Sequence, residues 1–551
     1  MIRRWIALGL IAGVLACGDG DAPRRYGDNA TGDHNTWGGG PPGGMLVVMA
    51  DREPDQLNPI TFNSNPAYHV VHLMFRALAA RDSTLSNYAP DLATSWELKE
   101  DNTVELKLRN DVFWHDGRKV TAEDVIFTIE RQRDPATGSP RRGDVAAVVS
   151  AVARDSFTVD IKLDRGGLYT VNALLEVVPV PRHLLQNVPP AQMTNAPFNR
   201  NPVGNGFYRF AQWQPGQQLT LHADTAKPDG RAAIDRIVMR FIPDVNAAMT
   251  EMLTGQGDLI YKLPASQQAR AKQSNNVQVY TGPRVRPAWI AWNTRRAPLN
   301  DVRVRRALVM GIDRETLAKG MFSGLGEAAL SPIPTQLREH SRDVRPIPYD
   351  PASAQRLLQE AGWRDSNGDG ILDKGGRPLR IEIEFISSDQ TRQDVLVAIQ
   401  SMLRKIGVDI VPRAFESTTW VQHLRDGTFA GSFWGWGWGP GVVGPNAEMI
   451  FHSRSIPPKG PNFAAARNPR VDQLIDSVLV ITDTARARGV WRELEQALID
   501  DAVYAPIYMD PELFAVNSRF KNVKFRGIEW VEDVPYWYVD PGERLPRDRS
   551  R

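Results

Sequence analysis

The use of cysteine constrains this chain more than any other feature of its sequence. The 551 residues include one cysteine, Cys17, so neither an internal disulfide nor a cysteine zinc cluster can hold the fold together. The folded part must therefore rest on a hydrophobic core. A chain of this length can build one, because the fraction of surface buried on folding rises with chain length.

Residues 1–16 have the pattern of a secretory signal peptide. Arg3 and Arg4 give a positively charged start, and the uncharged apolar run over residues 5–16 is too short to cross a bilayer as a helix. The stretch that ends in Cys17 resembles a bacterial lipobox. That resemblance implies cleavage before Cys17 and attachment of acyl chains to its thiol, which anchors a protein to a membrane. The alternative is a lone apolar cysteine in an uncleaved helix.

Residues 17–44 predict a flexible tether between this anchor and the folded part. The segment is rich in Gly, Asp, Asn, Thr and Pro, and it ends in the sequence GGGPPGG at 38–44. It carries too few apolar side chains to offset the entropy that ordering would remove.

Charge and hydropathy exclude two other classes of partner. The formal net charge of +2 leaves no broad basic surface of the kind that nucleic acids require. After the signal peptide, no apolar stretch is long enough to span a membrane. We therefore expect no nucleic-acid partner, and membrane contact only through the lipid at Cys17.

Strand and helix patterns alternate along the folded part. Residues 45–49 form a short apolar run typical of a buried strand, whereas 104–109 and 157–163 alternate apolar and polar side chains as half-buried strands do. Residues 350–362 predict a helix with an aspartate cap, a proline at its first position and a glycine at its end. Residues 121–129 predict another helix. The chain therefore reads as an α/β protein.

Six stretches, in this order, resemble the extracytoplasmic peptide- and nickel-binding family of ABC importers, which includes the oligopeptide- and dipeptide-binding proteins. The resemblance covers nearly the whole folded part, from about residue 45 to about residue 525. The stretches are EPDQLNP (53–59), YAPDLATSWE (88–97), LRNDVFWHDG (108–117) running into TAEDV (121–125), NPVGNGFY (201–208), WNT (292–294) and DVRVRRAL (301–308).

For the fold, this resemblance implies an α/β, two-lobed periplasmic-binding-protein fold of type II. An extra lobe is inserted in the first lobe, and a ligand is enclosed between lobes that close about a hinge. The implied division places lobe I at 45–75, 200–285 and 510–545, the inserted lobe at 76–199, and lobe II at 286–509.

For function, the resemblance implies a binding protein without enzymatic activity or cofactor. Such a protein captures short peptides outside the cytoplasm and delivers them to an ABC permease and its ATPase subunits. ATP binding belongs to those partners, since the chain contains no Walker A sequence. We expect a lipid-anchored monomer in the cell envelope, periplasmic or extracytoplasmic.

The family's usual contact for a peptide ammonium is missing. In peptide-binding members, an aspartate in a stretch like Trp-x-x-Asp-Tyr-x-x-Pro holds the ammonium, but the matching stretch here, 433–445, has no carboxylate before Glu448. Instead, Trp434, Trp436 and Trp438 alternate with glycines. In a strand, all three indoles would point to one face and offer a ligand stacking surface and N–H donors. The alternative is a buried ladder of core side chains.

Five further residues are candidates for ligand contact. Trp292 and Asn293 lie where the chain enters lobe II, a place where binding sites form between lobes. Asn58, Asn63 and Tyr68 follow the first strand. They are able to donate to a ligand or to cap the next helix, and the sequence leaves both roles open.

Two other functions remain open as alternatives. The same fold could bind an oligosaccharide, an opine or a nickel complex, and a nickel complex would need histidines such as His423 and His452, which flank the tryptophan stretch. An envelope hydrolase would need a nucleophile and a base. His115 and Asp116 are better explained as part of an Asp-Gly turn, and no hydrolase motif is present.

Two loops match ligand-binding motifs in part. Residues 365–373 fit the start of a calcium loop, but its twelfth position is Gly376, where a glutamate is required. Whether this loop binds calcium or forms a plain turn before a strand is left open. Residues 439–444 match G-x-G-x-x-G by letter, yet Pro445 follows at once and no acidic residue stands at the required distance.

Overall fold

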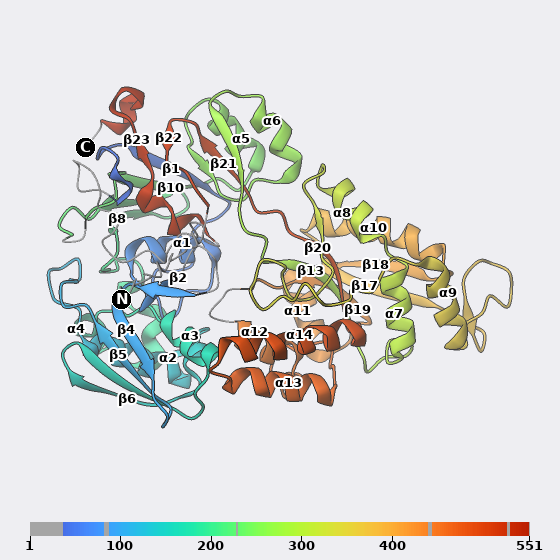
Figure 1. Ribbon diagram of the computed structural model, residues 1–551. Coiled ribbons are helices and arrows are strands. Elements are labelled where there is room, and N and C mark those ends of the chain that lie inside the picture. Colours follow the sequence, from blue (N-terminus) through green and yellow to red (C-terminus); the bar gives the residue numbers. More distant parts are fainter. Residues whose placement is uncertain (1–36, 82–86, 228–229, 439–442, 526–528, 550–551) are drawn as a thin grey trace, which may run out of the picture.

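The three largest β-sheets among the described residues divide the chain into three parts (Figure 1). A seven-stranded sheet organises lobe I, a six-stranded sheet organises lobe II, and a four-stranded sheet organises an inserted lobe. In Figure 1, lobe I lies at the upper left, the inserted lobe below it and lobe II at the right. The predicted two-lobed α/β fold with an inserted lobe is confirmed. The structure, a computed structural model, describes residues 37–81, 87–227, 230–438, 443–525 and 529–549.

Lobe I is built on a mixed sheet with the strand order β12-β21-β11-β1-β10-β9-β8. The apolar run predicted as a buried strand is β1, which is buried along its whole length and pairs in parallel with β10 and β11. Parallel strands buried on both faces read as continuous apolar runs for this reason. The elements are β1 (Met45–Ala50), α1 (Asn65–Met74), β8 (Tyr208–Gln214), β9 (Gln218–Ala223), β10 (Arg236–Phe241), α5 (Val245–Leu253), β11 (Leu259–Ile260), α6 (Gln268–Lys272), β12 (Val277–Thr281) and β21 (Leu513–Asn517).

The inserted lobe is an antiparallel sheet with the order β4-β5-β7-β6. The two predicted half-buried strands are its inner pair, β5 and β7, with alternating buried positions. A short hairpin, β2–β3, precedes the sheet. The elements are β2 (Ala79–Arg81), β3 (Tyr88–Pro90), β4 (Ala93–Leu98), β5 (Thr103–Leu108), α2 (Ala122–Arg133), β6 (Val148–Asp155), β7 (Thr158–Leu163), α3 (Leu168–Leu175) and α4 (Arg182–Leu185).

Lobe II has the strand order β14-β20-β13-β19-β17-β18, and separate hydrophobic clusters pack against its two faces. The predicted helix after Asp350 is α9, where the Asp350 carboxylate accepts from the Ser353 N–H at 2.9 Å. The elements are β13 (Pro287–Trp292), α7 (Val302–Met310), α8 (Arg314–Met321), β14 (Glu327–Ala328), α9 (Pro351–Glu360), β17 (Arg380–Ile386), α10 (Gln390–Arg404), β18 (Asp409–Phe415), α11 (Ser417–Asp426), β19 (Gly431–Gly435), α12 (Val443–Phe451), α13 (Pro469–Val480), α14 (Thr484–Asp501) and β20 (Tyr504–Met509).

The described chain begins packed against lobe I. Trp37 is buried, its N–H donates to the Arg231 carbonyl at 2.9 Å, and its ring meets that of Phe207 edge-on. Residues 37–44 therefore belong to the folded part rather than to the expected tether. The signal peptide and Cys17 lie outside the described residues. Within the described ranges, no helix combines the length and hydrophobicity needed to cross a membrane.

The buried carboxylate of Asp258 links the first strand of lobe I to the C-terminal segments of the chain. Asp258, which is fully buried, accepts from the Val47 N–H in β1 at 2.9 Å and from two nitrogens of Arg519 at 3.0 and 3.1 Å. Arg519 also donates to the Met45 carbonyl at 2.7 Å, and Arg547 donates to Asp258 at 2.8 Å. Burial raises the pKa of Asp258, so its ionised form depends on these cations.

We predict that Asp258→Ala destabilises the protein strongly. The substitution removes Asp258 from both Arg519 and Arg547 and leaves Asp548 as the remaining carboxylate beside Arg519; breaking a buried ion pair in this way costs about 3–5 kcal/mol. A control, Glu382→Ala, removes an ion pair with Arg413 whose side chains are about half exposed, and should cost about 1 kcal/mol or less. Calorimetric melting of both variants tests this. Equal losses of melting temperature would show that the Asp258 contacts add nothing beyond a surface pair.

Candidate functional site

Two chain segments connect lobe I with lobe II, and they run beside each other. One joins β12 to β13 and the other joins β20 to β21. The Gly282 N–H donates to the Glu512 carbonyl at 2.9 Å, and the Asp510 N–H donates to the Arg286 carbonyl at 3.1 Å. Because β12 pairs with β21 and β13 pairs with β20, the crossovers form a continuous ribbon. A few residues between two rigid lobes are where a hinge forms.

Arg286 joins this ribbon to the rest of lobe I. Its Nε lies 3.0 Å from Glu512 Oε1 on the other crossover, and its Nη2 donates to Glu529 Oε1 at 3.0 Å. Glu529 Oε2 in turn lies 3.0 Å from Nε2 of His69, a fully buried residue of α1. We call Arg286, Glu512, Glu529 and His69 the hinge network.

The hinge network contains more acid than Arg286 neutralises. Burial raises the pKa of Glu512 to about 7, against the opposing charge of Arg286. Burial acts on Glu529 as well, but the hydrogen bond with His69 and the charges of His69 and Arg286 keep its pKa below the ordinary value. Burial also raises the pKa of the neighbouring Asp510. A cationic group placed among these carboxyls would favour their ionised forms.

A second group of ionisable side chains lies beside α1. Arg81 donates to both carboxylate oxygens of Glu176 at 2.9 and 2.7 Å, and its Nη1 lies 3.5 Å from Glu532. Burial raises the pKa of Glu532 to about 7. Tyr68 stacks on His72 in α1 with ring centroids 3.8 Å apart. Tyr68 directly precedes His69 of the hinge network. This second group and the hinge network therefore lie next to each other along α1.

Lobe II reaches the hinge network through the loop after β19. The Trp436 N–H donates to the Pro287 carbonyl at 3.3 Å. A Cβ atom added to Gly437 would lie 3.8 Å from Arg286 Cγ, an ordinary contact distance. If Trp434 is aligned with the tryptophan of Trp-x-x-Asp-Tyr, Gly437 stands where the aspartate would be. The missing carboxylate therefore leaves room for a side chain beside the Arg286 guanidinium.

The three alternating tryptophans do not share one strand face. Strand β19 ends at Gly435, so only Trp434 lies in it. Trp434 and Trp438 are 4% and 1% exposed and belong to the core of lobe II, packing on Trp289 and Phe451. The expected row of exposed indoles is wrong for these two, since the glycines end the strand instead of continuing it. Trp436 is half-buried and stays a candidate for ligand contact.

The candidates at the entry to lobe II and in the first loop have structural partners. Trp292 and Asn293 are fully buried, and the Asn293 amide donates to the carbonyls of Gly427 and Phe429 at 3.0 and 2.9 Å. Asn58 is fully buried as well and donates to Asn199 at 3.0 Å. These three residues hold loops and core in place, so their side chains are not available to a ligand in this structure.

Asn63 and Tyr68 keep exposed surface. Asn63 is exposed, its N–H donating to Asp55 Oδ2 at 2.9 Å, and Tyr68 is half-buried on α1. Ligand contact remains a prediction for both. The sequence alone does not identify Arg286 and Glu529, because neither belongs to a motif and 243 residues separate them.

The histidines expected for a nickel complex have carboxylate partners in lobe II. His423 Nδ1 lies 3.1 Å from Glu384, and His452 lies 3.4 Å from both Asp472 and Asp476. Across the described part of the chain, no group of three or more His, Cys, Asp or Glu side chains is arranged to hold a metal ion.

The calcium-like loop is satisfied by its own backbone. The Asp365 carboxylate accepts from the N–H groups of Gly368 and Gly370 at 2.7 and 3.0 Å. Asp369 accepts from the Ile371 N–H at 2.8 Å. These bonds account for the Asp and Gly residues as turn formers.

The residues considered for a hydrolase do not form a catalytic pair. His115 lies 3.1 Å from the Gly206 carbonyl, and burial lowers its pKa to about 3. Asp116 contacts a different histidine, His183, at 2.6 Å. Both residues hold the turn between β5 and α2.

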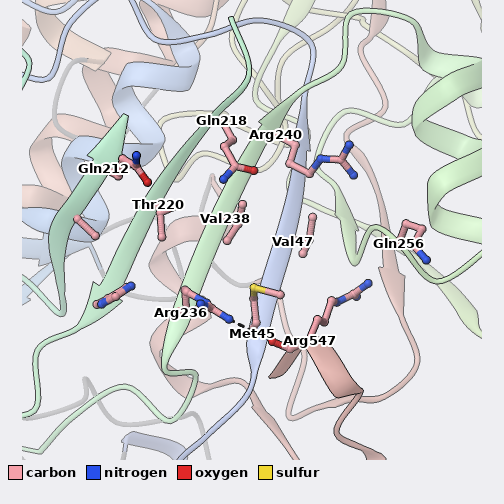
Figure 2. Close-up of a pocket in the computed structure, with 12 residues that line it drawn as sticks. Met45, Val47, Gln212, Gln218, Thr220, Arg236, Val238, Arg240, Gln256 and Arg547 are labelled. Carbon is pink, nitrogen blue, oxygen red and sulfur yellow. Dashed lines mark hydrogen bonds between the residues drawn. The ribbon is translucent and has the colours of Figure 1, made fainter. Parts of the chain in front are cut away.

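A cavity of about 700 Å³ lies over the face of the lobe I sheet that carries Val47 and Val238 (Figure 2). Val47 and Val238 contribute to its floor, and Arg236, Arg240 and Arg547 carry positive charge at its sides. It is lined by residues of lobe I and by Arg547 near the C-terminus, and none of the predicted ligand residues is among them. The cavity therefore lies apart from the hinge network.

Comparison with known proteins places these observations in a family. The model for bacterial extracellular solute-binding proteins, family 5 (middle part), matches residues 87–457. The oligopeptide-binding protein AppA of Bacillus subtilis is 28% identical over 504 residues, which cover 90% of this chain and 92% of AppA. The nickel-binding periplasmic protein of Escherichia coli is 26% identical over 467 residues, covering 82% and 86%. The structure of Bacillus subtilis AppA with a nonapeptide superposes with a TM-score of 0.77, covering 91% of this chain and all of that one.

The different burial of two indoles leads to a prediction. Trp434→Ala should lower the free energy of unfolding by about 3–5 kcal/mol, because it empties a core site. Trp436→Ala should cost about 1–2 kcal/mol, since its indole is half-buried, and should weaken ligand binding more than it weakens the fold. Melting temperatures and ligand titrations of both variants test this. A Trp434→Ala protein that melts like wild type would contradict the core assignment.

Proposed function

The chain belongs to the bacterial extracellular solute-binding proteins of family 5, and on that premise we propose that it captures short peptides between its lobes for delivery to an ABC importer. The observation that carries the proposal is the hinge network. Both crossovers, α1 and the Trp436–Gly437 loop of lobe II meet there, and its charged groups are buried or half-buried. Unevenly paired charges of this kind mark functional sites more often than surface pairs do.

Peptides suit this arrangement better than the other cargoes. A peptide brings an ammonium, a carboxylate and a backbone that every peptide shares, and the hinge network supplies carboxylates for the first of these. The structure of AppA is a complex with a nonapeptide, and AppA is 28% identical to this chain. Its ligand therefore supports a peptide as the cargo here. A nickel complex is the alternative, suggested by the Escherichia coli relative, but His423 and His452 have carboxylate partners.

The delivery step and the anchor belong to the same proposal. The sequence before Cys17 supports lipid attachment there, and residues 17–36 would then be the tether that lets lobe I and lobe II dock on a permease. The partners proposed are the permease and its ATPase subunits, with this chain acting as a monomer.

Thermal melting of residues 37–551 tests the cargo. Trp37 is retained because it packs on lobe I. Pools of peptides of two to six residues should raise the melting temperature, because a ligand at a hundredfold excess over Kd stabilises the folded state by about 2.7 kcal/mol. Pools of oligosaccharides, opines and nickel chelates serve as parallel arms. A rise in melting temperature with one of these pools and none with peptides would assign a different cargo. The family to which the chain belongs would stay the same.

Restoring the missing carboxylate should strengthen peptide binding. We predict that Gly437→Asp tightens binding of peptides with a free amino terminus by about tenfold, because a charge-assisted hydrogen bond contributes about 1.5 kcal/mol or more. Gly437→Asn is the matched control, with the same shape and no charge. N-acetylated peptides should gain nothing. An equal gain for the Asp and Asn variants would mean that the ammonium is not held near residue 437.

A further inference from the structure

Arg141 is fixed against the first loop of lobe I by a short segment of the inserted lobe. It lies between α2 and β6, where the Ser139 hydroxyl donates to the Ile60 carbonyl at 2.7 Å. The Arg141 Nη1 donates to the Phe62 carbonyl at 2.7 Å, and the guanidinium carbon lies 3.5 Å from the centre of the Phe62 ring. One edge of the guanidinium is thus used, and its plane is held over an aromatic ring.

The charge of Arg141 has no direct counter-ion within the described ranges. No carboxylate among those residues approaches it to ion-pair distance, and the acids that act on it from further away are Asp144 and Asp55. Asp55 already accepts from the N–H groups of Asn63 and Ser64 at 2.9 and 3.2 Å and from the Ser64 hydroxyl at 2.6 Å. Its oxygens are therefore committed to the turn before α1.

Because Arg141 is half-buried, the lack of a counter-ion costs free energy. Burial lowers the pKa of Arg141 to about 10. Burial also raises the pKa of Asp144 to about 7, with Glu176 adding to that effect while Arg141 and Arg81 oppose it. A half-buried cation without a counter-ion loses hydration that nothing replaces. Arg81 and Arg286, which lie in similar surroundings, each face two carboxylates.

Arg141 lies at the far end of the group of side chains that leads to the hinge network. The Phe62 ring beneath it is 6.4 Å from the ring of Tyr68, and the Tyr68 ring is 6.1 Å from that of His69. His69 then contacts Glu529, which binds Arg286. From the hinge network to Arg81 the group therefore has two carboxylates for each arginine, and at Arg141 it has a guanidinium without an ion pair among the described residues.

We propose that Arg141 binds a carboxylate of the ligand, foremost the carboxyl terminus of a peptide. The free N–H groups of the guanidinium present the fork geometry that carboxylates match, and the Phe62 ring keeps water from one face. This inference rests on the proposed peptide cargo. It adds the direction in which the peptide lies, with its carboxyl end toward the inserted lobe and its ammonium toward the hinge carboxylates. A carboxylate on an Asp or Glu side chain has the same chemistry, so the test separates the two sources.

The test uses the soluble chain of residues 37–551 in four forms: wild type, Arg141→Gln, Arg141→Lys and Arg142→Gln. Arg142 is the exposed neighbour and serves as the matched control. A library of peptides of three to nine residues without Asp or Glu is made twice, once with free and once with amidated carboxyl termini. A third library is amidated but contains Asp and Glu. Binding is followed by melting shift and by calorimetric titration.

We expect wild type and Arg142→Gln to bind the free-acid library about tenfold more tightly than the amidated one. Arg141→Gln should lose that preference, and Arg141→Lys should keep part of it, because a lysine retains the charge without the fork. A preference of wild type for the third library over the plain amides, lost in Arg141→Gln, would assign the site to side-chain carboxylates.

Two outcomes overturn the inference. If Arg141→Gln folds with an unchanged melting temperature and keeps the wild-type preference, Arg141 does not bind the carboxylate. If wild type binds all three libraries equally, the site does not require a carboxylate, and the peptide cargo still stands. Wild type that responds to none of the libraries removes the proposed cargo itself and this inference with it, so the two failures are distinguishable.

Discussion

The ion pairs of Arg286 are the interaction on which the joint between the lobes depends. The residue lies on one crossover, contacts Glu512 on the other, and binds Glu529 in the C-terminal part of lobe I. A desolvated carboxylate without a partner costs several kcal/mol, so both acids rely on the same guanidinium. One cation shared by two carboxylates leaves excess negative charge. Burial raises the pKa of Glu512 to about 7, and the charges of Glu529 and Asp510 add to that effect while Arg286 opposes it.

The position of this charge follows from the chain topology. The crossovers are held to each other by backbone hydrogen bonds, so lobe II can rotate about them without losing the ribbon. Trp436 and Gly437 move with lobe II, whereas Tyr68 and His69 move with lobe I. A ligand that contacts both sides binds the closed arrangement better than the open one. That difference in affinity is what drives closure in a two-state protein.

The fold was more predictable from the sequence than the site. The buried strand β1, the alternating strands β5 and β7 and the capped helix α9 each follow from patterns within a few residues. The same kind of local pattern predicts the tryptophan row, and this prediction is wrong for Trp434 and Trp438, because a strand that ends at Gly435 cannot align the residues beyond it. Asn58 and Asn293 are ligand candidates from their places after the first strand and at the entry to lobe II, yet buried amides more often bind backbone groups, as both do here.

Local sequence patterns do not predict the hinge network or Arg141, for a different reason. Whether a charged side chain has a partner depends on contacts between segments hundreds of residues apart, as with His69 and Glu529, separated by 460 positions. Only the folded chain shows that Arg81 and Arg286 are matched, while Arg141 has no such partner among the described residues. A half-buried cation left unmatched makes the empty protein less stable than it could be. That cost is recovered when a ligand supplies the missing charge, so the groups that weaken the empty fold are the ones that select the ligand.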